Sequence, residues 1–217
     1  MAVGNIGNTA FARRQFPWRL LVALAAMAGL VLWFIVHQAL PYTSFDPATY
    51  TDYYWPRRFG LVPHIAGGVV AILVGLAQLW LGLTGRTGGL HRTLGRIYLG
   101  AVAIASAAAF YLAVTIGSQS FAYASGLFGL ASAWVITTSM AYVSIRHRAL
   151  EQHREWMIRS YVVAFAFVTF RLLDKPLIAW NVAKDTEVWS MMAFACWAVP
   201  LLVTEPLLQL RKILRRN

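Results

Sequence analysis

The feature that most constrains this chain is a series of six continuous apolar blocks. Each block holds roughly 20 residues, the length that an α-helix needs to cross about 30 Å of hydrocarbon. Strands cross a membrane only as a closed barrel, whose segments alternate between apolar and polar residues. The blocks here are continuous, so the sequence predicts an all-α membrane protein, a six-helix transmembrane bundle forming one domain over residues 1–217. The predicted spans are residues 18–40, 61–83, 94–117, 121–145, 157–180 and 188–208.

The overall composition agrees with this membrane assignment. Hydrophobic residues make up 59% of the chain and charged residues 12%, whereas about 25% of residues in soluble domains are charged. The first block follows the basic residues Arg13, Arg14 and Arg19. It is too long for a signal-peptide core of about 7–15 residues, so we expect an uncleaved span. The single cysteine, Cys196, excludes an intrachain disulfide and argues against a cysteine-based metal site.

The basic residues are distributed unequally between the two predicted sides of the membrane. With six spans, one side receives 14 of the 19 Lys and Arg residues. Because cytoplasmic loops carry the excess of positive charge, both termini are predicted to be cytoplasmic. The net charge of +11 then reflects orientation and contact with anionic headgroups, and nucleic-acid binding is not expected without a basic soluble domain. The larger set comprises Arg13, Arg14, Arg19, Arg86, Arg92, Arg96, Arg146, Arg148, Arg154, Arg159, Arg211, Lys212, Arg215 and Arg216.

A short motif occurs twice at the cytoplasmic ends of predicted spans. Residues 91–98 read His-Arg-Thr-Leu-Gly-Arg-Ile-Tyr, and residues 153–161 read His-Arg-Glu-Trp-Met-Ile-Arg-Ser-Tyr. Both copies contain His-Arg, then an arginine, then a tyrosine two residues later, and both lead into a span that runs outward. Spans two–three and four–five are therefore predicted to be parallel repeats of one helical hairpin, related by an axis along the membrane normal.

The repeated motif would bring two histidines, His91 and His153, to one face of the membrane. An imidazole from each of two facing helices can ligate haem iron, and arginines can bind haem propionates or a quinone headgroup. The alternative is that these residues only anchor the helix ends among the headgroups. Under the first interpretation His91 and His153 are the metal ligands. The candidate cofactor-binding residues are His91, His153, Arg92, Arg96, Arg154, Arg159, Tyr98, Tyr161 and His64.

Glu205 lies near the inner end of the sixth predicted span. Ionisable residues inside a membrane are functional candidates because they are costly to keep there. One interpretation is an ion pair with Arg96, Arg154 or Arg159. The other is a catalytic role, in which Glu205 exchanges protons with a quinone or another substrate.

The outer end of the predicted bundle also contains notable side chains. His64 opens the second span among apolar residues, and His37 ends the first span. The outer loop at residues 41–60 is rich in tyrosine and tryptophan. Such a loop is either an interfacial aromatic belt or a lid over an outer pocket.

Three segments of the chain resemble the bacterial membrane-protein family called domain of unknown function 2306. They are His-Ile-Ala-Gly-Gly at residues 64–68 and the two motifs at residues 91–98 and 153–161. The resemblance covers roughly residues 61–171. This family has no agreed activity, so the resemblance implies a multi-pass protein of the bacterial plasma membrane and little chemistry.

A more distant resemblance is to the cytochrome b561 group, which also has histidines on the third and fifth of six spans. That group holds a second haem between spans two and four. The fourth predicted span here contains no histidine. The resemblance therefore implies a single inner b-type haem at His91 and His153.

The sequence leaves three functions open, and it does not decide whether the chain is an enzyme. The first is a membrane redox protein with a haem b or quinone site at the cytoplasmic face. The second is a non-enzymatic accessory or assembly protein that binds subunits of a membrane complex. The third is a small-solute transporter, although transport sites usually need polar groups at mid-membrane that are scarce here.

Overall fold

The computed structural model describes residues 18–117, 120–182 and 184–216, in which every regular element is helical. Arg13 and Arg14, which contribute to the predicted charge asymmetry, lie outside the described residues. The longer helices are α1 (Trp18–Phe34), α3 (Arg58–Leu83), α4 (Gly89–Ile116), α5 (Phe121–Arg146), α6 (Leu150–Ala164), α7 (Ala166–Ala179) and α8 (Asp185–Arg216). The α1–α3 connection consists of the short helices η1 (Ile35–Ala39), η2 (Leu40–Ser44), α2 (Pro47–Tyr54) and η3 (Trp55–Arg57).

Five helical segments of the described chain are long and apolar enough to cross a membrane. The prediction of an all-α protein with several spans is therefore confirmed. The fifth predicted span, residues 157–180, is not among the five. It is divided between α6 and α7, each of which is shorter than a helix that spans a bilayer. The five segments are residues 18–44, 52–83, 89–116, 121–146 and 185–214.

The boundary between α6 and α7 falls at Phe165, where the helix bends. The ψ angle of Phe165 is −5°, far from the helical value near −42°. The Thr169 hydroxyl donates to the Phe165 carbonyl 3.4 Å away, and such back-bonding bends helices. The backbone hydrogen bonds Phe165 to Tyr161 and Thr169 to Phe165 persist, so α6 and α7 form one bent segment. At about 1.5 Å per residue, this segment is roughly 45 Å long.

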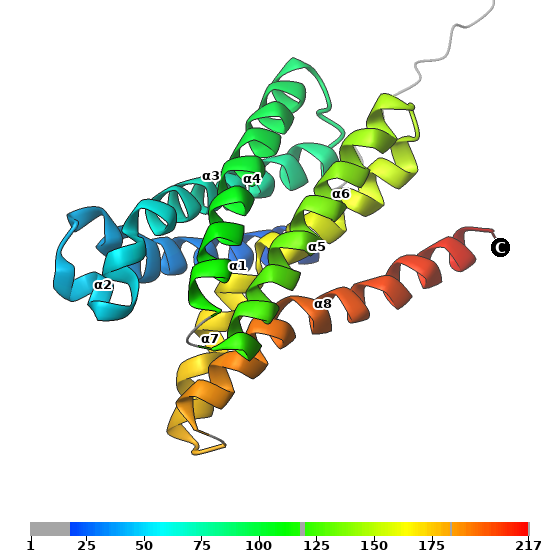
Figure 1. Ribbon diagram of the computed structural model, residues 1–217. Helices are drawn as coiled ribbons and strands as arrows, with labels where there is room; N and C mark the ends of the chain where they lie inside the picture. Colours follow the sequence, from blue (N-terminus) through cyan, green and yellow to red (C-terminus); the bar gives the residue numbers. More distant parts are fainter. Residues whose placement is uncertain (1–17, 118–119, 183, 217) are drawn as a thin grey trace, which may run out of the picture.

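The helices pack as two hairpins with α8 and α1 against them. α3 pairs with α4, and α5 pairs with α6 (Figure 1). α8 packs against α5, α6 and α7, whereas α1 lies more loosely against α3 and α7. In Figure 1 the α3–α4 connection lies near the top and the end of α8 at the right, whereas α2 lies at the far left and the α7–α8 connection at the lower left.

Small residues bring α3 close to its neighbours, but not along the seven-residue glycine spacing. The glycines at positions 68, 75 and 82 are candidates for helix packing, because small residues let helices approach closely in a membrane. At Gly68 and Gly82, however, a Cβ atom would meet nothing within 4 Å. Only the middle glycine of this series is therefore a close-packing position.

The packed face of α3 instead follows a four-residue spacing, Gly67, Ala71 and Gly75. Positions four apart lie on the same face of an α-helix. A Cβ atom at Gly67 would lie 2.9 Å from the Ala101 carbonyl oxygen, and Ala71 is fully buried. A Cβ atom at Gly75 would run directly into the Tyr161 ring. These residues fix the α3–α4 and α3–α6 contacts.

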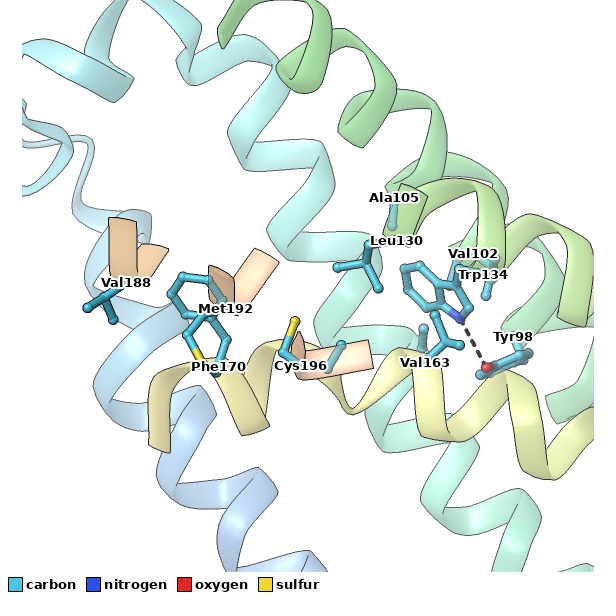
Figure 2. Packing of buried hydrophobic residues seen from close by; sticks show 13 residues of the cluster. Tyr98, Val102, Ala105, Leu130, Trp134, Val163, Phe170, Val188, Met192 and Cys196 are labelled. Carbon is cyan, nitrogen blue, oxygen red and sulfur yellow. Dashed lines mark hydrogen bonds between the residues drawn. The ribbon is translucent and has the colours of Figure 1, made fainter. Parts of the chain in front are cut away.

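The main core contains a buried chain of polar side chains among apolar ones. The Trp134 indole N–H donates to the Tyr98 hydroxyl, 3.3 Å away (Figure 2). The Tyr98 and Ser160 hydroxyl oxygens are 2.8 Å apart, and those of Ser160 and Thr138 are 2.7 Å apart. Because buried polar groups are costly without partners, these bonds hold α4, α5 and α6 in one arrangement.

The aromatic connection between α1 and α3 folds onto the bundle. Tyr50 is fully buried, and its hydroxyl donates to the Tyr42 carbonyl, 2.6 Å away. Burial raises the pKa of the Tyr50 hydroxyl, because the phenolate form would lose its hydration. Tyr50 packs with Leu61 and Leu112 in a second core cluster. The connection is therefore packed as part of the fold.

Candidate functional site

A cavity of about 140 Å³ lies between α1, α3, α4, α5 and the bent α6–α7 segment. Most of its wall is apolar, with side chains such as Leu112 and Leu130. The aromatic connection contributes Tyr42 and Tyr54, so it also covers part of this cavity. Ligand sites in proteins are typically apolar hollows with a few convergent polar groups.

His64 supplies an imidazole to the cavity wall. Its Nδ1 atom lies 3.0 Å from the Ala105 carbonyl oxygen of α4. Gly67, one turn later on α3, allows the close approach of the two helices that this hydrogen bond requires. The imidazole also packs edge-on against the Phe167 ring, with 5.7 Å between centroids. The orientation of His64 is therefore fixed from two sides.

A second polar group in the wall centres on Arg171 of α7. Its guanidinium pairs with the Asp174 carboxylate at 3.1 Å, and Asp174 is buried. The two residues lie one turn apart on α7, a spacing at which opposite charges on a helix can pair. The hydroxyls of Tyr54 and Tyr123 interact with each other and with the Arg171 charge, and both tyrosines line the cavity.

The size of the cavity limits what it can hold. An apolar protein cavity of about 150 Å³ accommodates benzene. A volume of about 140 Å³ therefore suits one six-membered ring. A porphyrin contains four pyrrole rings and is too large for it.

His91 and His153 lie away from this cavity, at the starts of α4 and α6. The cavity is lined instead by the last part of α4, including Ala109 and Ile116. The two imidazoles are close enough to interact electrostatically. The two motif histidines therefore lie within electrostatic reach of each other, and a site shared by them stays a prediction.

The two motif histidines are held differently by the preceding helix of each hairpin. The Gln78 side chain of α3 donates to the His91 backbone carbonyl. In the other hairpin, the His153 side chain itself bonds through Nδ1 to the Ala141 carbonyl, 2.9 Å away. The His91 Nδ1 atom is buried and has no hydrogen-bond partner among the described residues. The Nδ1 atom is therefore hydrogen-bonded in His153 but not in His91.

Glu205 forms the ion pair that was one of its two expected roles. The Arg159 Nε atom donates to Glu205 Oε2 at 3.0 Å, so α6 is joined to α8. Glu155 extends the network, since it lies 3.8 Å from Arg159 and 2.8 Å from Lys212. Of the expected partners, Arg159 is the one that the structure pairs with Glu205; a catalytic role for Glu205 stays a prediction.

The remaining motif residues divide into exposed and buried side chains. Arg92, Arg96 and Arg154 are exposed, as expected of residues that anchor helix ends. Tyr98 belongs to the buried polar chain, and the Tyr161 hydroxyl donates to the Ile72 carbonyl at 3.1 Å. Both tyrosines thus join helices in this structure, and their predicted contact with a cofactor stays a prediction.

The sequence pointed to His64 but not to the other polar residues of the cavity. Tyr123 lies three residues after Ser120, whose side chain caps the start of α5, and it belongs to neither copy of the repeated motif. For Arg171, the only local sequence signal is Asp174 one turn later, which an ion pair within the helix explains. The missing signal was the packing of the α1–α3 connection and α7 against the same cavity, which depends on contacts distant in sequence.

Comparison with known proteins identifies one family. Residues 61–208 match the model of the family described as "predicted membrane protein (DUF2306)". The chain belongs to this family. The match extends the sequence resemblance to the end of the sixth predicted span, and it agrees with the helices found there. No curated protein and no solved structure matches the chain.

The described residues contain no group of three or more His, Cys, Asp and Glu side chains suited to a metal ion. A haem held by two histidines is a different kind of site, so this result does not test it. The haem at His91 and His153 stays a prediction.

Proposed function

We propose that this protein binds the ring of a quinone-class lipid in the cavity between α3, α4, α5 and α7. The observation that carries the proposal is a ring-sized, mostly apolar cavity whose lining includes the polar residues His64, Arg171, Tyr54 and Tyr123. A quinone-type ring has apolar faces and oxygen atoms at its edge, and it dissolves in the bilayer through its tail. His64, Arg171 and the Tyr54–Tyr123 pair would orient those oxygen atoms.

This proposal keeps the quinone branch of the sequence hypothesis but moves the site. The motif arginines expected to bind a headgroup are exposed, except for Arg159, which pairs with Glu205. His64 is the predicted cofactor-binding residue that lines the cavity. The site would therefore lie in the half of the bundle that contains the α1–α3 connection.

The proposal includes six spans, with α6 and α7 acting as one bent span. Both are helical on either side of a single residue, and together they exceed the thickness of the hydrocarbon core. Six spans put both termini on the side with most of the basic residues, which is the cytoplasmic side of a bacterial plasma membrane. The cavity would then lie toward the outer face.

A cavity-filling variant tests the binding proposal. Gly68 lines the cavity, and its Cβ position is open, so Gly68→Leu places a side chain in the cavity without a backbone clash. We expect isothermal titration of the purified protein with a short-chain benzoquinone and with its reduced quinol to show saturable binding of at least one of the two forms, which Gly68→Leu abolishes.

Gly82→Leu is the matched control on the same helix. Its Cβ position is equally open, and Gly82 does not line the cavity. This variant should bind the same form of the ring as the unmodified protein does. Partition of the probe into detergent is common to all three samples, so equal heats from all three would contradict the proposal.

A second candidate function is a haem held by His91 and His153. It is favoured by the buried, unpartnered Nδ1 atom of His91 and by its proximity to the second imidazole. Protein purified from haem-replete cells would then show a redox-sensitive Soret band that His91→Ala and His153→Ala both remove. A colourless, folded protein would contradict this candidate and leave the quinone proposal intact.

A further inference from the structure

The hydrogen bond to Ala105 determines which nitrogen of His64 carries a hydrogen. A carbonyl oxygen can only accept, so the Nδ1 atom 3.0 Å away must be the donor. In an uncharged imidazole the other nitrogen, Nε2, then has a lone pair and no hydrogen. α4 thus fixes the tautomer of a side chain that belongs to α3.

The surroundings of His64 keep this second nitrogen a hydrogen-bond acceptor. The ring lies among apolar side chains and against Phe167, where a charged imidazole would be poorly solvated. Nε2 forms no hydrogen bond with the described residues. It is also not one of their fully buried polar atoms that lack a partner, so it is accessible to a ligand.

A ligand oxygen beside Nε2 must therefore bring its own hydrogen. The carbonyl oxygen of an oxidised quinone also has only lone pairs to offer, so it and the lone pair of Nε2 would repel each other. A hydroxyl would instead donate to Nε2 and satisfy it. At the other polar group, Arg171 and the tyrosine hydroxyls can donate to an oxygen of either form.

We propose that the cavity selects a hydroxyl-bearing ring, of the reduced quinol or phenol type, whose O–H donates to Nε2 of His64. This inference rests on the proposed function, since it names the chemical form of the ring bound in that cavity. The selectivity comes from the Ala105–His64 hydrogen bond, so it should disappear with the imidazole.

A pair of redox-inert probes tests the inference: a 4-alkylphenol and its methyl ether, which lacks the O–H. We expect the phenol to bind the unmodified protein about tenfold more tightly, the scale set by a buried acceptor left without a donor. In His64→Phe, which keeps an aromatic ring in place, the two probes should bind with equal affinity. His37→Ala is the control, because His37 is exposed and outside the cavity wall, and it should keep the tenfold ratio.

The outcomes separate this inference from the proposal beneath it. Equal binding of the two probes to the unmodified protein overturns the selectivity while leaving ring binding in place. A preference for phenol that survives in His64→Phe also overturns it. If neither probe binds, the proposed function fails, and the inference fails with it. The comparison on the unmodified protein holds even if His64→Phe does not fold.

Discussion

At the scale of single residues, Gly75 shows how closely α3 and its neighbours approach. An added Cβ atom there would run into the Tyr161 ring and lie 3.2 Å from the Tyr98 ring. Both tyrosines are buried and hydrogen-bonded, so neither ring can move away freely. The tyrosines of the two motif copies therefore meet at one glycine.

We predict that Gly75→Ala lowers the free energy of unfolding by about 1–3 kcal/mol, the usual range for overpacking a core. Gly82→Ala, seven residues later on the same helix, has open space at its Cβ position and should have little effect. Thermal unfolding in detergent measures both. Equal melting temperatures for the two variants would contradict the close approach of α3 and α6.

The buried hydroxyls of Tyr98 and Ser160 provide a second test at this scale. Tyr98→Phe and Ser160→Ala should each destabilise the fold by about 1 kcal/mol, because each leaves a buried partner short of a hydrogen bond. The double variant should lose less than the sum, because both remove the same bond. Denaturant unfolding of the four proteins gives this coupling.

Ser106→Ala is the matched control for that cycle. Ser106 is also buried on α4, but its hydroxyl has no partner among the described residues. Removing an unpartnered buried hydroxyl should be neutral or stabilising. A loss as large as that of Ser160→Ala would show that the cost comes from the lost oxygen volume rather than from the hydrogen bonds.

At the scale of elements, α6 and α8 are joined by charged side chains. Arg159 contacts both Glu205 and Glu155, and Lys212 of α8 contacts Glu155. Glu205 is about half exposed, so water weakens its pair with Arg159. The network therefore fixes the position of α8 more than it adds stability.

We predict that Arg159→Glu lowers the melting temperature, because it places a carboxylate beside Glu205 and Glu155. Adding Glu205→Arg should restore part of the loss by re-forming the pair with reversed charges. The expected effect of losing the pair alone is about 0.2–1 kcal/mol. Double-variant stability no better than that of Arg159→Glu would contradict a direct contact between α6 and α8.

At the scale of the whole molecule, the central question is whether the bent α6–α7 segment crosses the membrane. If it does, the α3–α4 and α5–α6 connections face one side and the α7–α8 connection faces the other. If it does not, the α5–α6 and α7–α8 connections share a side. The positive-inside distribution favours the crossing.

Cysteines introduced one at a time into a Cys196→Ala variant test this topology, because each can be labelled only from the side of the membrane that it faces. Cys196 is buried and small, so alanine replaces it at modest cost. Thr87, Gln152 and Lys184 are exposed and lie in or beside the three connections. We predict that a membrane-impermeant maleimide labels Lys184→Cys on intact cells, and labels Thr87→Cys and Gln152→Cys only after permeabilisation. Labelling of Gln152→Cys together with Lys184→Cys would show that α6–α7 does not cross.

The sequence by itself determined the class of the fold. Continuous apolar blocks as long as a bilayer allow little other than spanning helices, because no other open structure satisfies its backbone in lipid. Five predicted spans accordingly match helical segments of the structure, to within one residue where they extend beyond them. The fifth predicted span, residues 157–180, is the one that the structure divides, between α6 and α7.

Only the tertiary structure decided which residues share a site. The motif repeat brought His91 and His153 near each other, as expected from topology. The cavity, however, gathers His64, Tyr123 and Arg171 from α3, α5 and α7. Their grouping depends on close helix approaches at small residues such as Gly67 and on the packing of the α1–α3 connection. Such contacts are distant in sequence, and no local pattern encodes which helix faces meet.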